Sequence, residues 1–181
     1  MIIGDPYKIA VIVQVINEWS ETWINGVFML TINGKIIPEE IFTSTLECDC
    51  KELNDNLDRM LSCPPVDMEL YELDGREAFI KMYNLTCPNN ADTDNDYRYK
   101  VSTSGLEDND YWVFAVSNGS DIRFIASKLI FGDNVDAFSV DKMTECNVSV
   151  NYLSALAAEF REITSLMFKG ESMNKTGKNK C

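Results

Sequence analysis

A strand and a tight turn can be recognised in Trp23-Ile-Asn-Gly-Val-Phe-Met-Leu-Thr-Ile-Asn-Gly-Lys-Ile-Ile-Pro38, and the other expected elements are arranged around them. Within residues 27–32 both faces of the alternating pattern are mostly apolar, which predicts a strand covered on both sides near the middle of a sheet. Asn33-Gly34 follows at once, and both residues tolerate the positive φ of a two-residue type I′ turn. Residues 35–37 then run back alongside until Pro38, which has no N–H to donate to a ladder.

Further strands are predicted wherever apolar residues alternate, at residues 7–16, 41–46, 98–103, 111–117 and 122–130. Residues 7–16 should pair antiparallel with residues 23–32, because only a short polar connection separates them. The last three strands should form a meander, with Asn118-Gly119 as the turn between residues 111–117 and the next strand. Residues 131–147 show no such pattern and are expected to be irregular, with a loop also expected at 88–96.

The first helix is expected to follow Asp49-x-x-Glu52, which resembles a capping box. Apolar residues then recur at helical spacing, and Pro64-Pro65 ends the helix. A last helix over about 150–168 carries one apolar stripe, which should pack on the sheet.

The segment after Asp74-Gly75 is ambiguous, because this dipeptide could also turn a hairpin between residues 67–73 and 76–83. Asp74-x-x-Glu77 is a second capping box, however, and Glu77 and Lys81 form a favourable i,i+4 pair. A short helix at about 75–84 is therefore preferred to a strand.

These elements predict an α+β fold with a single domain. It would contain a mainly antiparallel sheet of about six to seven strands, two short helices and a C-terminal helix packed on the sheet. The chain has 181 residues, enough to bury roughly 70% of the surface of the unfolded chain without a metal or a disulfide. The domain should span residues 1–168, and residues 169–181, which lack apolar content, should form a disordered basic tail.

The charge balance is strongly acidic, with 16 basic against 29 acidic residues and a net charge of −13. The last thirteen residues carry four Lys and one Glu, so residues 1–168 have a net charge of −16. Direct nucleic-acid binding is not expected, because it depends on Lys and Arg displacing counterions from phosphates. A basic protein would be steered towards such a surface, although the acidity could also serve solubility alone.

The expected location is cytoplasmic. No basic residue precedes the first apolar run, Gln14 interrupts that run, and nothing approaches the roughly 20 apolar residues of a membrane span. The six cysteines are accordingly interpreted as reduced thiols.

No catalytic or cofactor motif is present. The chain has no histidine, which removes Ser-His-Asp and Cys-His nucleophilic machinery and all imidazole metal sites. Asp92-x-Asp94-x-Asp96 starts like a calcium loop, but Tyr97 and Thr103 stand where an EF-hand needs Gly and Glu. Cys48-x-Cys50 has no second pair at zinc-ligand spacing. We therefore expect no enzyme activity, no cofactor and no small-molecule substrate.

What remains is a surface for a protein partner, because carboxylates complement a basic partner and aromatic rings anchor interfaces. The candidate residues are acidic residues of expected loops and of the outer face of the first helix, and aromatic residues next to those loops: Asp55, Asp58, Asp92, Asp94, Asp96, Tyr97, Glu107, Asp108, Asp110 and Tyr111. The alternative is that the aromatic rings belong to the core and the charges to a solvated rim.

Three N-terminal features together resemble the immunity protein 42 family. They are the opening Met1-Ile-Ile-Gly-Asp-Pro6, then Trp23-x-Asn-Gly26, then Ile32-Asn-Gly-Lys-Ile-Ile-Pro38. The strand-rich segment 98–129 and the final helix are similar to the layout of that family as well. The resemblance covers most of residues 1–168, but residues 39–96 carry no motif of the family.

The resemblance implies a bacterial immunity protein that binds and neutralises a cognate toxin domain. That toxin would be a nuclease such as a CdiA C-terminal toxin, and the producing cell would be protected from contact-dependent growth inhibition. The alternative, based on charge alone, is an acidic nucleic-acid mimic that inhibits DNA-binding or restriction proteins. The resemblance assigns no binding residues, so the ten candidates above rest on charge and position.

Overall fold

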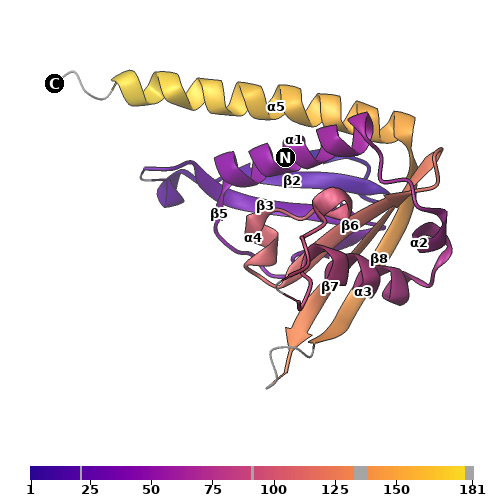
Figure 1. The fold of residues 1–181 in the computed structure, drawn as a ribbon. Coiled ribbons are helices and arrows are strands. Elements are labelled where there is room, and N and C mark those ends of the chain that lie inside the picture. Colours follow the sequence, from indigo (N-terminus) through magenta and orange to yellow (C-terminus); the bar gives the residue numbers. More distant parts are fainter. Residues whose placement is uncertain (21, 91, 133–137, 178–181) are drawn as a thin grey trace.

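The fold was obtained as a computed structural model. It describes residues 1–20, 22–90, 92–132 and 138–177, with residues 170–177 described by their helical backbone only. The described elements form two antiparallel sheets with helices around them, which confirms the α+β prediction (Figure 1). The sequence analysis expected one sheet of six to seven strands, and the structure divides eight strands between two sheets.

The first sheet contains β1 (Ile2–Gly4), β2 (Ile9–Val15), β3 (Asn25–Ile32) and β4 (Lys35–Ile37) in that spatial order, and β5 (Ser44–Thr45) also pairs with β3. A short 3-10 turn, η1 (Asn17–Trp19), lies between β2 and β3. The predicted antiparallel pairing of β2 with β3 is confirmed, with Val11 opposite Leu30. Asn33 and Gly34 have φ of 51° and 77°, as a type I′ turn requires.

The second sheet contains β6 (Tyr111–Ser117), β7 (Asp121–Phe131) and β8 (Phe138–Ser149) as a meander. The prediction that residues 131–147 are irregular is wrong where the structure describes them, and residues 133–137 lie outside the described residues. Residues alternate in β8 only in two short pieces, 138–141 and 144–149, and the register shift opposite Ala126–Lys128 separates them. The pattern in sequence is therefore too short to indicate one long strand. Pairing with β7 along nearly its whole length holds it instead.

The predicted strand at residues 98–103 is also wrong. Residues Tyr97–Tyr99 form a 3-10 turn, η2, and Ser104–Glu107 form a short helix, α4, with an extended segment between them. The Asp96 side chain accepts the backbone N–H of Arg98 and so begins the turn. Tyr99 and Val101 are both buried, which explains why apolar residues alternate here. The segment nevertheless lacks the regular series of backbone hydrogen bonds that defines a strand.

Helix α1 spans Leu46–Ser62 and begins earlier than predicted. Thr45 is its N-cap, so Asp49 and Glu52 lie inside the helix and do not form a capping box. Of the predicted strand at 41–46, only the two residues of β5 remain, because Leu46 already belongs to the helix.

Two helices follow, α2 (Met68–Glu72) and α3 (Gly75–Thr86). The preference for a helix over a hairpin after Asp74 is confirmed, and the Asp74 side chain accepts the N–H of Arg76 at 2.9 Å. Helix α2 was not expected from the sequence. It begins at Asp67, whose side chain accepts the N–H of Leu70.

The last helix, α5, runs from Val150 to Gly177 and does not end near residue 168. The apolar stripe ends with Met167 and Phe168, which pack on the core, and α5 extends beyond α1 from there (Figure 1). A helix that is already nucleated can continue without burying a stripe, which the sequence analysis did not allow for. Residues 178–181 lie outside the described residues, and the division into a 1–168 domain and a disordered tail stays a prediction.

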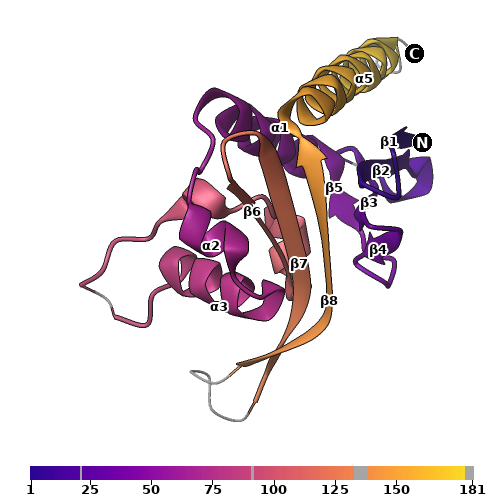
Figure 2. The same ribbon diagram turned by 90° about the vertical axis from the view of Figure 1, so that its right-hand side faces the viewer.

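The main core lies between the two sheets, next to α1 and α5. Leu30 of β3, Leu53 of α1, Phe124 of β7 and Phe160 of α5 belong to this cluster. A second cluster lies on the other face of β6 and β7, which α2 and α3 cover (Figure 2). Helix α5 packs mainly on α1 and, near its start, on β1 and β8. Helix α1 is therefore enclosed on its inner side by both sheets and α5.

Within the described residues, no helix combines the length and the apolar content needed to cross a membrane.

Replacing Phe160 with Ala should lower the free energy of unfolding by about 3–5 kcal/mol, because the ring is fully buried between α5 and the core. The matched control is Leu166→Ala on the same helix, where the side chain is 64% exposed and the change should stay within about 0.5 kcal/mol. Urea unfolding of both variants measures the difference. Equal losses would contradict the packing of α5 described above.

Candidate functional site

Helix α1 has one apolar side and one charged side. The apolar side faces the core, with Leu53, Leu57 and Met60 no more than 1% exposed. The opposite side carries four charged residues, each about one turn after the one before: Glu47, Lys51, Asp55 and Asp58. We call these four residues the α1 ridge. A hollow lies on each side of the α1 ridge, so this surface is both charged and concave in places.

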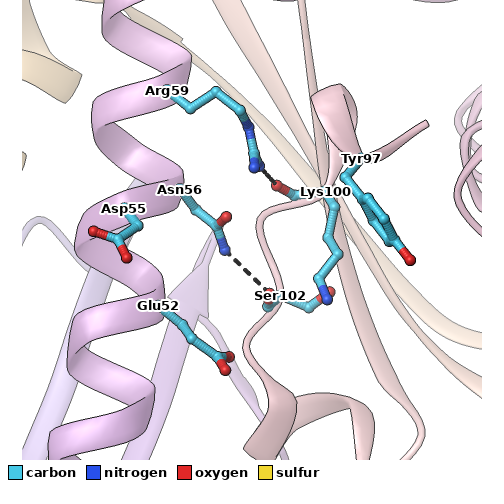
Figure 3. Close-up of a pocket in the computed structure, with 7 residues that line it drawn as sticks. All are labelled: Glu52, Asp55, Asn56, Arg59, Tyr97, Lys100 and Ser102. Atoms are coloured by element: carbon cyan, nitrogen blue, oxygen red, sulfur yellow. Dashed lines mark hydrogen bonds between the residues drawn. The ribbon is translucent and has the colours of Figure 1, made fainter. Parts of the chain in front are cut away.

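The first hollow, of about 350 Å³, separates α1 from the segment 97–102 (Figure 3). Its lining comes from two walls. The residues are Glu52, Asp55, Asn56 and Arg59 of α1, and Tyr97, Lys100 and Ser102 of the opposite segment.

Hydrogen bonds between the walls fix the width of this hollow. The Asn56 side-chain amide donates to the carbonyl oxygens of Val101 and Ser102, at 3.1 and 3.2 Å. One turn earlier, the Glu52 carboxylate accepts the N–H and the hydroxyl of Ser104, at 2.6 and 2.8 Å. These four bonds tie two side chains of α1 to a segment 45 to 52 residues later in the chain.

A buried carboxylate lies beneath this contact. Asp49 is 3% exposed and accepts hydrogen bonds from the hydroxyls of Ser44 and Thr103 and from the N–H of Gly105. A Cβ at position 105 would come within 2.5 Å of the carboxylate, so only glycine lets the start of α4 approach α1 this closely.

Lys100 and Glu107 form an ion pair at 2.6 Å behind the first hollow. Ser102 donates to the same carboxylate at 2.9 Å. Burial nevertheless raises the pKa of Glu107, an effect that the contacts with Lys100 and Ser102 oppose. The Lys100 ammonium also lies over the rings of Tyr97 and Trp112, at 5.7 and 5.9 Å from their centroids.

The second hollow, of about 450 Å³, lies between α1 and α5. All four residues of the α1 ridge line it, together with Asn54 and, from α5, Arg161, Thr164, Ser165 and Phe168. Asp58 and Arg161 form an ion pair across it. Asp55 lines both hollows and pairs with Lys51 at 3.3 Å.

The structure brings together some of the predicted site residues. Asp55 and Tyr97 line the first hollow, Asp58 lines the second, and Glu107 lies behind the first. Tyr97 is 50% exposed, as an interface aromatic should be. Asp96 is engaged with Arg98 at 2.8 Å and with the start of η2.

The other predicted residues lie elsewhere. Asp92 and Asp94 are exposed on the loop before η2, and Asp108 and Asp110 belong to the turn between α4 and β6; none of the four lines either hollow. Tyr111 is 3% exposed and is therefore a core residue, so its nomination as an exposed aromatic is wrong.

Sequence reasoning missed Asn56, Arg59, Lys100 and Ser102. Arg59 follows Asp55 by one helical turn, so helical spacing could have placed it beside the ridge. Lys100 and Ser102 could not be placed, because the sequence predicted a strand where an extended segment crosses α1.

No set of three or more His, Cys, Asp or Glu side chains within the described ranges is arranged to hold a metal ion. The site offers partly buried charges, hydrogen-bonding groups and an exposed ring next to two hollows. These are features that complement another protein surface.

The model of the family described as immunity protein 42 matches residues 1–163 of this chain. Among solved structures, the chain is similar to the crystal structure of CdiI from Burkholderia dolosa AUO158, with a TM-score of 0.68 and 19% identity. That similarity covers 91% of this chain and 99% of the other, and at this identity it supports the fold alone. A search of curated proteins gives no match.

Replacing Glu107 with Gln should remove one contribution to the pH dependence of stability, a contribution that favours the folded state at lower pH. Because the pKa of Glu107 is raised, the folded chain holds this proton to a higher pH than the unfolded chain, whose value is near 4.5. The stabilisation that comes from this difference in proton binding is complete below the pKa of the unfolded chain. It is lost as the pH rises through the raised pKa of the folded chain. The unaltered chain should therefore gain stability relative to E107Q as pH falls from 7 towards 4.5.

Urea unfolding of both chains at several pH values measures this difference. A relative loss of stability on acidification would contradict the prediction, because it would mean that the ion pair with Lys100 outweighs the burial of the carboxylate.

Proposed function

Because the chain belongs to the immunity protein 42 family, we propose that it binds and neutralises the toxin domain encoded beside it. The match over residues 1–163 carries this proposal. The cognate toxin would be a nuclease, such as the C-terminal domain of a CdiA protein. The chain would then protect its producing cell from contact-dependent growth inhibition.

The charge of the chain supports a basic partner. A net charge of −13 raises the encounter rate with a cationic protein and competes with nucleic acid for the same positive surface. Inhibition by occupying that surface requires no catalysis, no cofactor and no small-molecule substrate. We propose that it takes place in the cytoplasm, without direct binding of nucleic acid by this chain.

We place the docking surface on the α1 ridge and the two hollows beside it. The ridge supplies the carboxylates Asp55 and Asp58, and Tyr97 supplies a half-exposed ring at the edge of the first hollow. Interfaces gain their affinity from a few anchors in pockets, and these hollows provide pockets next to charge. The exposed carboxylates Asp92 and Asp94 would contribute to steering from outside this contact.

The runner-up is a nucleic-acid mimic that inhibits DNA-binding or restriction proteins, and the acidity alone favours it. A mimic should inhibit several unrelated DNA-binding proteins. An immunity protein should instead protect against one toxin type.

Co-expression with the toxin domain of the adjacent gene tests the proposal. Growth should be restored, and the two purified proteins should elute together on a sizing column. If growth is not restored and no complex forms, the immunity role is excluded. Inhibition of unrelated restriction enzymes at similar concentrations would favour the runner-up.

Reversing two of the three ridge carboxylates, as Asp55→Lys with Asp58→Lys, should slow association with the toxin domain by about tenfold at low salt, because steering depends on the local field. The salt dependence of the on-rate should also become weaker. Exposed ion pairs contribute little to stability, so the variant should stay folded.

Stopped-flow or surface-based kinetics measures the rates. The matched control reverses the same number of charges, as Glu72→Lys on α2 with Glu77→Lys on α3, two exposed carboxylates on the far side of the β6–β8 sheet. Equal effects of the two changes would show that only net charge matters and that the surface lies elsewhere.

A further inference from the structure

Arg59 differs from most arginines of this chain in its surroundings. Three of the five arginines have a carboxylate partner: Arg98 with Asp96, Arg123 with Glu145 and Arg161 with Asp58. Within the described part of the chain, Arg59 and Arg76 form no ion pair and donate only to backbone carbonyls. Arg76 is exposed, whereas Arg59 is half-buried in the wall of the first hollow.

Some N–H donors of the Arg59 guanidinium have no acceptor among the described residues. One terminal nitrogen donates to the carbonyl of Lys100, while the Nε–H is buried and has no acceptor among the described residues. Burial also lowers the pKa of this group, although an arginine remains protonated at neutral pH. A buried donor of a charged group left without a partner is costly. An arriving acceptor would meet the terminal N–H groups first and would reach Nε only after the half-buried side chain shifts.

The other charges of the hollow are already engaged. Lys100 pairs with Glu107, Asp55 pairs with Lys51, and Glu52 accepts two hydrogen bonds from Ser104. Figure 3 shows Glu52 and Arg59 at opposite ends of the hollow with Asn56 between them. The end of the hollow at Arg59 is therefore a local cationic point on an acidic surface.

We propose that the Arg59 end of the first hollow receives a carboxylate side chain, Asp or Glu, of the bound toxin domain. This inference rests on the proposed immunity function and adds a determinant of specificity to it. A guanidinium binds a planar carboxylate through paired N–H donors, which fixes geometry as well as charge.

This arrangement selects among basic partners. A cationic protein without a carboxylate at the matching position would cover Arg59, leave it unpaired and place its own positive charge nearby. A generic mimic of a polyanion gains nothing from such a cation. The carboxylate contact would thus distinguish the cognate toxin from other basic proteins that the α1 ridge attracts.

The test measures the affinity of the full chain and its variants for the toxin domain of the adjacent gene. Arg59→Gln should weaken binding by about tenfold to a hundredfold, mainly through faster dissociation. Arg59→Lys should recover only part of this loss, because an ammonium lacks the paired donors. Arg76→Gln is the matched control and should bind within twofold of the unaltered chain.

A second measurement avoids any loss of fold in the variants. In the unaltered, ¹⁵N-labelled chain, the Nε–H resonance of Arg59, assigned by its absence from R59Q, should shift on addition of the toxin domain. An unshifted resonance in a formed complex, or R59Q binding within twofold, would overturn this inference while leaving the proposed function intact.

Two other outcomes are equally decisive. Complete absence of a complex with the unaltered chain would overturn the proposed function and this inference with it. Saturable shifts of the Arg59 resonance with inorganic phosphate alone, without any shift from the toxin domain, would assign the hollow to a free oxyanion and overturn the partner carboxylate.

Discussion

The fold depends on a buried carboxylate that connects the start of α1 with a segment more than fifty residues later in the chain. Asp49 of α1 accepts hydrogen bonds from Ser44 of β5, from Thr103 and from Gly105 at the start of α4. A carboxyl group this deeply buried is stable only when hydrogen bonds satisfy its oxygens, and here three donors do so. The bond set fixes α1 against the segment 97–105, which forms the opposite wall of the first hollow. The shape of the candidate surface is therefore a consequence of core chemistry.

The strands of the first sheet could be predicted because local signals agree there. Residues 27–32 are apolar on both faces, and Asn33-Gly34 dictates its own turn, so pattern and turn chemistry point to one structure. The errors arose where tertiary contacts override pattern. Strand β8 is mostly polar and is held by pairing with β7. Tyr99 lies in the turn η2, and Val101 lies in an extended segment that donates a hydrogen bond to β6, so their apolar alternation does not mark a strand.

The candidate site was predictable in part for the same reason. Asp55 and Asp58 lie opposite the apolar stripe of α1, and helical spacing alone puts them on the surface. Acidity in a loop did not identify the hollows, because neither hollow is lined by the loop carboxylates Asp92, Asp94, Asp108 and Asp110. Tyr111 follows acidic residues in the sequence, but its side chain belongs to the core. No sequence pattern shows that Arg59 lacks a carboxylate, since that depends on which segments meet in space.

Helix α1 packs in the core with one face and presents the charged α1 ridge on the opposite face. Substitutions along the outer face leave the interior contacts untouched. The same fold can consequently present many different ridge sequences. A few substitutions on this one helix could restore complementarity to a partner whose surface has changed, without altering the core.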